Sequence, residues 1–471
     1  MYSYQLKLRS GVELEDDGDV LLIASRDGRR LRIHDSGAGL NAILTHLVDG
    51  GYAAAQLVEI ARIAEPDANA MSFHYLLARL NQRGFLSYTL LEGSRKLALL
   101  EPTSPQFSFQ DQECTGALRF SRFGYIRREG SAMIVECPLG HARITLLDPL
   151  LCALPALLAK PQSIDEIALL LPSFYSESVR EAVVLLMNAG AVFRTDVSDR
   201  VFEDQDQSLR LWEFHDLLFH VRSRSGRHEY PLGPTFRLKD TLPHPPMQAA
   251  IASRKRIQLA GPMPSVSSPD FFAVLESRRS RRSRGEKPLS LEQLGAFLWH
   301  TARTQADVPS EVECPESYGY QLRPYPSGGA IHELEIYLTV SGCIGLEQGL
   351  YHYDPVAHEL GYLADMGESQ MSLVRDAMAA SGTQVPPDVL ITLAARFGRN
   401  AWKYEGLSYS LIQKNVGCLY QQMYLVGTAL GLSPCALGLG NSEHFCSAAG
   451  TSRYEESSVG EFMLSGADSL R

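Results

Sequence analysis

The sequence lacks any pair of cysteines at the Cys-x-x-Cys spacing that zinc and iron–sulfur sites use. Its eight cysteines are scattered along the chain, at Cys114, Cys137, Cys152, Cys314, Cys343, Cys418, Cys435 and Cys446. Several stand in apolar runs, where a cysteine behaves as a small buried hydrophobic side chain. The sequence therefore predicts no metal site and a reducing, cytoplasmic environment in which the thiols stay free.

The sequence also lacks an excess of positive charge and a long hydrophobic run. The formal net charge of the 471 residues is -10, which argues against nucleic acid as a partner. The most apolar stretch, residues 146–158, is interrupted by Asp148, Pro149 and Pro155 and is too short to cross a bilayer, so no membrane partner is expected. Because no basic region precedes an apolar core at the N-terminus, no signal peptide is expected either.

Two copies of one pattern fill the first 200 residues or so. The first copy has two short β runs, three helical patterns and a closing strand, at residues 21–23, 31–33, 38–48, 54–64, 68–82 and 85–88. The second copy repeats this order, at residues 134–135, 144–146, 149–158, 163–171, 176–188 and 190–193. A period of about 105–110 residues is far longer than a solenoid repeat, so it indicates duplicated domains.

Strands followed by three helices, the last two in helix-turn-helix relation, are typical of winged-helix domains, whose first use to consider is DNA binding. The third helical pattern of each copy carries few cations: Arg79 and Arg83 belong to the first copy, and Arg180 to the second. We therefore favour capture of an extended peptide along an exposed strand edge. A purely structural role for one or both copies is the alternative.

An arginine run follows a proline-rich connector. Residues 201–265 are expected to be extended, because prolines cluster at 242–246 and 261–264. Five arginines then fall between Arg278 and Arg284, with two serines among them. Guanidinium and hydroxyl donors together suit a phosphate group, although a charge run of this kind is also typical of a solvated surface.

A glycine-rich turn and a Lys-Tyr pair stand farther along the chain. Residues 326–329 read Pro-Ser-Gly-Gly, and such glycines let backbone amides approach a flat ligand closely. Residues 400–407, which include Lys403 and Tyr404, are expected to form a loop before a long apolar helix. Adjacent side chains cannot point the same way in a regular helix or strand, so the backbone at 403–404 is expected to be irregular. A surface lysine beside a half-buried tyrosine is the alternative.

Four motifs in this order resemble those of the SagB/McbC-type azoline dehydrogenases of the nitroreductase superfamily. They are Arg278-Arg279-Ser280-x-Arg282, the Pro-Ser-Gly-Gly turn, Gly-Leu-Tyr-His-Tyr-Asp at 349–354, and Lys403-Tyr404 before a Gln-containing helix. With duplicated domains in front, the chain is most similar to the thiazoline oxidases of cyanobactin pathways. The resemblance implies an α+β fold: a C-terminal nitroreductase-like FMN domain (266–471), with a central sheet flanked by helices, preceded by two winged-helix-like peptide-recognition domains (1–100 and 105–200).

The resemblance also implies which residues form the site. The FMN phosphate is expected to be held by Arg278, Arg279, Ser280 and Arg282. The flavin is expected to be bordered, partly from the second subunit of a homodimer, by Pro326, Ser327, Gly328, Gly329, Gly438 and Gly440. Lys403 and Tyr404 match the family's catalytic pair. Asn415 and Gln422 stand where relatives more often have His and Asn, so they are not among the expected site residues.

The implied reaction converts thiazolines or oxazolines in a ribosomally made precursor peptide to thiazoles or oxazoles. It removes a proton beside a carbonyl and passes a hydride to FMN, which dioxygen reoxidises; a cyclodehydratase is a further expected partner. The Lys403 ammonium is expected to favour a Tyr404 phenolate as the base. Two alternatives stay open: an NAD(P)H-dependent nitroreductase or flavin reductase, which needs no Gly-x-Gly-x-x-Gly fingerprint, and a non-catalytic peptide-binding scaffold for a cyclodehydratase.

Overall fold

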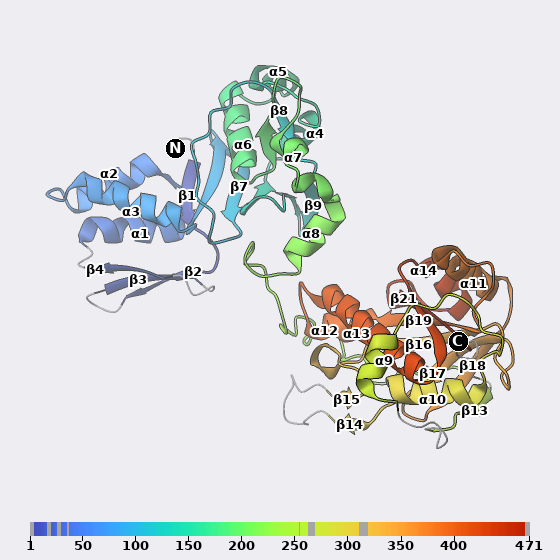
Figure 1. The fold of residues 1–471 in the computed structure, drawn as a ribbon. Helices are drawn as coiled ribbons and strands as arrows, with labels where there is room; N and C mark the ends of the chain where they lie inside the picture. Colours follow the sequence, from blue (N-terminus) through green and yellow to red (C-terminus); the bar gives the residue numbers. More distant parts are fainter. Residues whose placement is uncertain are drawn as a thin grey trace. The chain divides into compact units, whose positions relative to one another are not determined.

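The chain folds into two compact units, Met1–Tyr230 and Pro231–Arg471, each with its own hydrophobic core (Figure 1). The computed structural model describes residues 4–16, 20–25, 30–34, 37–253, 255–261, 269–309 and 319–466. Of the predicted proline-rich run at 261–264, residues 262–264 lie outside these ranges. Among the described helices, none combines the length and the apolar character needed to cross a membrane.

A seven-stranded antiparallel sheet runs through the whole first unit. In spatial order its strands are β5 (Tyr52–Ala53), β1 (Tyr4–Leu8), β6 (Leu86–Glu92), β7 (Arg95–Pro102), β11 (Ala142–Leu146), β10 (Ala132–Glu136) and β9 (Tyr125–Glu129). Strand β7 pairs with β6 of the first copy and with β11 of the second. The two copies therefore share one sheet, and one hydrophobic core serves both.

Three helices accompany the strands of each copy. They are α1 (Ala38–Asp49), α2 (Ala54–Ala64) and α3 (Ala70–Gln82) in the first, and α4 (Ala153–Leu157), α5 (Ile164–Leu170) and α6 (Ser176–Asn188) in the second. Ser163 caps α5 by accepting a hydrogen bond from the Glu166 N–H at 3.3 Å, as the Ser-x-x-Glu pattern predicts. The predicted helices are confirmed, whereas the winged-helix assignment and the boundaries at 1–100 and 105–200 stay predictions.

Smaller elements complete the first unit. A three-stranded sheet joins β2 (Val12–Asp16), β3 (Val20–Ser25) and β4 (Arg30–His34). A two-stranded sheet joins β8 (Leu118–Phe120) and β12 (Val192–Arg194). The remaining helical elements are the 3-10 turns η1 (Pro149–Cys152) and η2 (Leu209–Leu211) and the helices α7 (Phe202–Gln205) and α8 (Phe214–Arg222).

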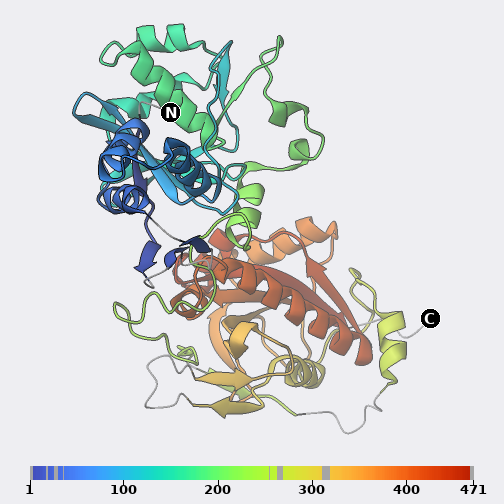
Figure 2. The same ribbon diagram turned by 90° about the vertical axis from the view of Figure 1, so that its left-hand side faces the viewer.

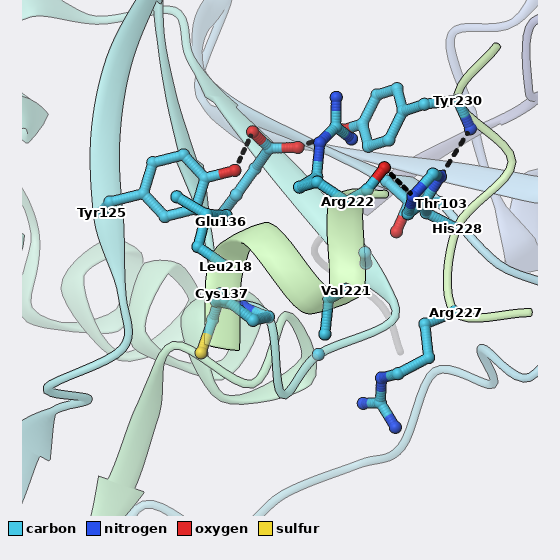
Figure 3. Close-up of a pocket in the computed structure, with 13 residues that line it drawn as sticks. Thr103, Tyr125, Glu136, Cys137, Leu218, Val221, Arg222, Arg227, His228 and Tyr230 are labelled. Atoms are coloured by element: carbon cyan, nitrogen blue, oxygen red, sulfur yellow. Dashed lines mark hydrogen bonds between the residues drawn. The ribbon is translucent and has the colours of Figure 1, made fainter. Parts of the chain in front are cut away.

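A buried carboxylate, Glu136, ties the last residue of the first unit to its sheet (Figure 3). The Tyr125 hydroxyl and the Arg127 Nε–H each donate to Glu136 Oε2 at 2.9 Å, and the Tyr230 hydroxyl donates to the other oxygen. Burial alone would raise the pKa of Glu136, but these three donors outweigh burial and hold it below its usual range. The adjoining pocket of about 30 Å³ has room for water and no more, so the cluster is a structural tie.

The second unit is built on another seven-stranded antiparallel sheet. In spatial order its strands are β13 (Lys255–Gln258), β18 (Glu359–Asp365), β17 (Gly349–Asp354), β16 (Leu334–Val340), β19 (Val389–Arg396), β21 (Glu456–Gly466) and β20 (Leu432–Leu437). Every residue of β16 is buried, because the strand lies in the middle of the sheet and both faces are covered.

Helices cover both faces of this sheet. α10 (Leu291–Ala302) and α13 (Ser408–Ala429) share a core with one face, while α11 (Glu368–Ser381) and α14 (Ser442–Ala449) pack on the other. Figure 2 shows α13 as a long helix running along the sheet. It buries Ile412, Val416, Leu419 and Met423, which recur at helical spacing. The predicted central sheet flanked by helices is confirmed.

The remaining elements of the second unit are α9 (Phe271–Ser277), α12 (Phe397–Lys403), the hairpin of β14 (Ala306–Val308) and β15 (Tyr320–Leu322), and the 3-10 turn η3 (Gly328–Ala330).

Residues 242–247 form an irregular strap along α12. Arg399 Nη1 donates to the Pro245 carbonyl at 3.2 Å, and Arg396 Nη2 to the Pro246 carbonyl at 2.7 Å. Prolines have no N–H to donate, so the arginines hold the strap by its carbonyl groups.

We expect Glu136 to stabilise the first unit at neutral pH and to lose this effect in acid. A carboxyl group with a lowered folded-state pKa stabilises the fold above its unfolded pKa of about 4.3, and the stabilisation disappears as pH falls through the folded pKa. Glu136→Gln should therefore lower the free energy of unfolding by about 1–3 kcal/mol at neutral pH. Urea unfolding followed by hydrogen-exchange mass spectrometry of residues 118–146 measures this difference. A difference that stays constant into acid would contradict the assignment.

Candidate functional site

Lys403 and Tyr404 stand where helix α12 ends. Lys403 is the last helical residue, and Tyr404 continues in an extended conformation, with φ -106° and ψ 134°. The prediction of a loop is wrong for residues 400–403, because the buried side chains of Arg399 and Trp402 bond to backbone carbonyls of distant segments and fix a helical turn here. The predicted irregularity between Lys403 and Tyr404 is confirmed.

Both side chains converge on one glycine. Gly329 has a φ of +62°, and a Cβ atom added there would lie 2.5 Å from Tyr404 Oη and 3.1 Å from Lys403 Nζ. A glycine at this position leaves room for both polar atoms and adopts the left-handed conformation without strain. The structure therefore brings together the Lys-Tyr pair and the Pro-Ser-Gly-Gly turn, two motifs that lie far apart in the sequence.

Burial sets the ionisation of both groups. It lowers the pKa of the Lys403 ammonium below its ordinary value. It raises the pKa of the Tyr404 phenol, and the negative charge of Glu333 raises that pKa further. The expectation that the neighbouring ammonium favours a Tyr404 phenolate is wrong, since desolvation penalises the charged form of each group. Burial therefore moves Lys403 toward the neutral amine, a proton acceptor, and keeps Tyr404 a neutral phenol, a hydrogen-bond donor.

An Asn-Glu pair absent from the predicted site lies at the base of the turn. Asn415 Oδ1 accepts from the Gly328 N–H at 3.0 Å, and its Nδ2 donates to Glu333 Oε1 at 2.9 Å and to Ser327 Oγ at 3.1 Å. Asn415 is 4% exposed and Glu333 0%. The sequence holds one indication of this role: Asn415 is an amide three residues after Ile412, on the apolar face of α13. Gln422, by contrast, donates to the His300 carbonyl at 3.0 Å, outside this network.

The arginine segment lies against the second half of α13. Ser280 Oγ and Tyr424 Oη are 2.8 Å apart, and the Arg278 guanidinium lies 5.2 Å from the centre of the Tyr424 ring. Tyr424 follows Asn415 by about 14 Å along the helix axis, at 1.5 Å per residue. The phosphate candidates and the Lys-Tyr pair thus form two groups at different levels of one helix.

The arginines of this segment have different surroundings. Arg284 Nε pairs with the fully buried Asp388 at 2.5 Å, so this arginine is structural. Arg279 and Arg282 are exposed, and within the described part of the chain neither forms an ion pair. Exposed guanidinium groups beside the Ser280 hydroxyl fit a phosphate group, which accepts from both donor types. That they bind FMN stays a prediction.

A pocket of about 410 Å³ opens along the first half of α13. Its lining includes α13 residues between Tyr409 and Tyr420, the turn that holds Gly438 and Gly440, and the start of β21. This volume lies in the range of cofactor pockets. A Cβ atom on Gly438 would meet nothing within 4 Å, so the backbone there is open to a ligand. Contact between these glycines and a flavin stays a prediction.

Comparisons with known proteins match the two units separately. The family model of the cyanobactin oxidase ThcOx matches residues 118–229, and that of the nitroreductase family matches residues 275–463. These matches support the similarity of the chain to SagB/McbC-type members of the nitroreductase superfamily. The resemblance carried by the four motifs is confirmed, and so is the nitroreductase-like fold of the C-terminal region.

Three curated relatives are similar to parts of this chain. A protein of Methanocaldococcus jannaschii named as a nitroreductase is 29% identical over 37% of this chain and 82% of its own length. The trifolitoxin-processing protein TfxB of Rhizobium leguminosarum bv. trifolii is 30% identical over 23% of this chain and 30% of its own length. The microcin B17-processing protein McbC of Escherichia coli is 28% identical over 24% of this chain and 43% of its own length. The matches thus span less than half of TfxB and McbC.

Among solved structures, the E. coli microcin synthetase McbBCD complex with truncated pro-MccB17 contains a similar chain. The alignment covers 54% of the present chain and 91% of that one, at 19% identity and a TM-score of 0.34.

Lys403 should react as an amine of low pKa, because burial disfavours its ammonium form. Competitive acylation over a range of pH, read by mass spectrometry of the peptide that contains Lys403, should give a midpoint below about 10.4, the ordinary lysine value. A midpoint at or above that value would show that the amine is not desolvated.

Gly329→Ala should displace the tips of Lys403 and Tyr404, because the new methyl group would overlap both. Gly382→Ala is a matched control: Gly382 also has a positive φ, +71°, but its added Cβ would meet nothing within 4 Å. Both changes should lower the free energy of unfolding by about 1–2 kcal/mol, the cost of a left-handed alanine. Gly329→Ala alone should shift the acylation midpoint of Lys403. Identical midpoints in the two variants would argue against the convergence on Gly329.

Proposed function

We propose that the chain is an FMN-dependent oxidase that converts thiazolines, or oxazolines, in a ribosomally made peptide to thiazoles or oxazoles. The observation that carries the proposal is the convergence of a desolvated lysine and a protonated tyrosine on Gly329, inside a nitroreductase-like unit. The match of residues 118–229 to the cyanobactin oxidase model supports the same class of substrate. So does the similarity to two proteins named for processing trifolitoxin and microcin B17.

The ring loses one proton and one hydride as it becomes aromatic. When bound, FMN would supply the acceptor for the hydride, and dioxygen would be the oxidant that restores it, leaving as hydrogen peroxide. Lys403 Nζ, whose neutral form burial favours, takes the proton from the ring carbon beside the carbonyl group. Tyr404 Oη donates a hydrogen bond to the carbonyl oxygen as negative charge develops there. Gly329 keeps the backbone clear of both tips.

Three groups of residues hold the cofactor in this proposal. The phosphate is bound by Arg278, Arg279, Ser280 and Arg282, whose guanidinium and hydroxyl donors suit an anion. The flavin is bordered by Pro326, Ser327, Gly328, Gly329, Gly438 and Gly440. The protein acts as a homodimer whose second subunit contributes part of this border.

The first unit retains the peptide in this proposal, and a cyclodehydratase is the partner that makes the azoline. A peptide held by one segment meets the site at a high effective concentration, so a weak contact at the ring is sufficient. Each copy in the first unit has the strands and three helices expected of a winged-helix-like peptide-recognition domain, at about residues 1–100 and 105–200.

A nitroreductase that takes hydride from NAD(P)H is the second candidate, favoured by the similarity along 82% of the M. jannaschii protein. The two candidates differ in the source of electrons. Rapid reduction of the bound flavin by NADPH without peptide would favour the nitroreductase, whereas reduction by an azoline peptide under anaerobic conditions would favour the azoline oxidase. Flavin binding without either reaction would indicate a scaffold.

The deciding experiment incubates the FMN-loaded protein with a thiazoline peptide in air and measures the peptide mass. Each oxidised ring should lose about 2 Da, the mass of the proton and hydride removed. Lys403→Ala and Tyr404→Phe should keep FMN bound, since neither side chain is among the phosphate ligands, and should slow turnover by about 10²–10⁴-fold. A protein that gains no flavin absorbance with added FMN, or variants with unchanged rates, would overturn the proposal.

A further inference from the structure

The turn beneath the Lys403–Tyr404 pair is conformationally strained. Gly329, Ala330 and His332 have φ values of +62°, +53° and +48°. Alanine and histidine rarely adopt this left-handed conformation, and each costs about 1–3 kcal/mol unless the surrounding structure imposes it. Strain of this kind concentrates at functional sites, so the contacts that impose it are of interest.

The Asn415 amide forms hydrogen bonds with both ends of this turn. It accepts from the Gly328 N–H at the start of the turn and donates to the Glu333 carboxyl group at the end. Inside the turn, the His332 N–H donates to Ser327 Oγ at 3.1 Å. Because Asn415 projects from the buried face of α13, the turn is anchored to the most extensively packed helix of the second unit.

Glu333 is a fully buried carboxyl group whose hydrogen-bond donors are neutral side chains. Asn415 Nδ2 lies 2.9 and 3.1 Å from its two oxygens, and Ser327 Oγ lies 3.3 Å from Oε2. Among the described hydrogen bonds of this carboxyl group the donors are uncharged, and burial raises its pKa. A buried acid of this kind, bonded to the turn that carries Gly329, is a candidate for a role in the chemistry of the neighbouring site.

We propose that Glu333 and Asn415 are positioning residues of the Lys403–Tyr404 pair. Asn415 fixes the turn on which the pair converges, and Glu333 places a buried carboxyl group where its charge opposes ionisation of the Tyr404 phenol. The phenol is thereby kept as a hydrogen-bond donor. The effect on turnover rests on the proposed function, whereas the effect on the phenol is a property of the protein alone.

The groups around the phenol come from three elements besides α13, whose nearby Asn415 is neutral. The turn contributes Glu333 and His332, and burial lowers the pKa of His332 to about 3, so that its imidazole is neutral. Helix α12 contributes the Lys403 ammonium and the buried Arg399, which donates to the Ile331 carbonyl at 2.8 Å. The segment at 233–242 carries the exposed Arg237, Lys239 and Asp240, and it pairs with Glu405, the residue after Tyr404. Of the acids, Glu333 is the one whose charge raises the pKa of Tyr404, so removing that charge should favour the phenolate.

The first test is a titration that needs neither cofactor nor substrate. The full chain is prepared with carbon-13 in the tyrosine rings, and Tyr404→Phe assigns the Tyr404 signal. In Glu333→Gln the Tyr404 signal should titrate at lower pH than in the original chain. Glu335→Gln is the matched control, because Glu335 is also buried but pairs with His352 and Arg396; it should leave the signal unchanged. An unchanged Tyr404 titration in folded Glu333→Gln would overturn the inference.

The second test separates position from charge by kinetics. Asn415→Ala should reduce kcat by about a hundredfold, as expected when catalytic groups shift by about 1 Å, with FMN still bound. Gln422→Ala removes an amide from the same helix outside the network and should keep the original rate. In Glu333→Gln the basic limb of the pH–rate profile should move to lower pH. If no azoline oxidation occurs in any form but the Tyr404 titration shifts, the proposed function fails and the assignment of Glu333 stands. A rate unchanged in Asn415→Ala would overturn the role of Asn415.

Discussion

The hydrogen bonds of the Asn415 amide are the interaction on which the site of the second unit depends. They join three parts of the chain that have no local reason to meet: the long helix α13, the turn at 327–333 and, through Gly329, the end of α12. Asn415 lies beside side chains that fill the core under the sheet, so its position is fixed by the packing of the whole unit. The accuracy of the site therefore derives from the rigidity of the core.

Burial opposes the charged form in both polar clusters of this chain, but the outcomes differ. Around Glu136 three donors surround one carboxylate, and their hydrogen bonds outweigh the loss of water, so the charged form is favoured. Around Lys403 and Tyr404 desolvation is the largest cause of the pKa shifts, and it moves both groups toward their neutral forms. The first arrangement stabilises a charged group inside the fold, and the second favours a neutral amine beside a neutral phenol.

Local patterns predicted much of the fold. The helical period of α6 and α13 and the capping box at Ser163 depend on neighbours in the sequence, so the sequence alone revealed them. Helix α12 was mistaken for a loop, because it is held by bonds from Arg399 and Trp402 to distant carbonyl groups. The shared sheet, the role of Asn415 and the sign of the Tyr404 pKa shift likewise depend on distant contacts, which no spacing along the chain encodes.

Strand β7 is shared by both copies in the first unit, since it pairs with β6 on one side and with β11 on the other. Side chains alternate between the two faces of a strand, so deleting one residue within β7 would turn the inward face of the following residues outward. Neither copy could then keep its pairing, although each would retain its three helices. The first unit is therefore expected to fold cooperatively, so that an error in one strand affects both halves.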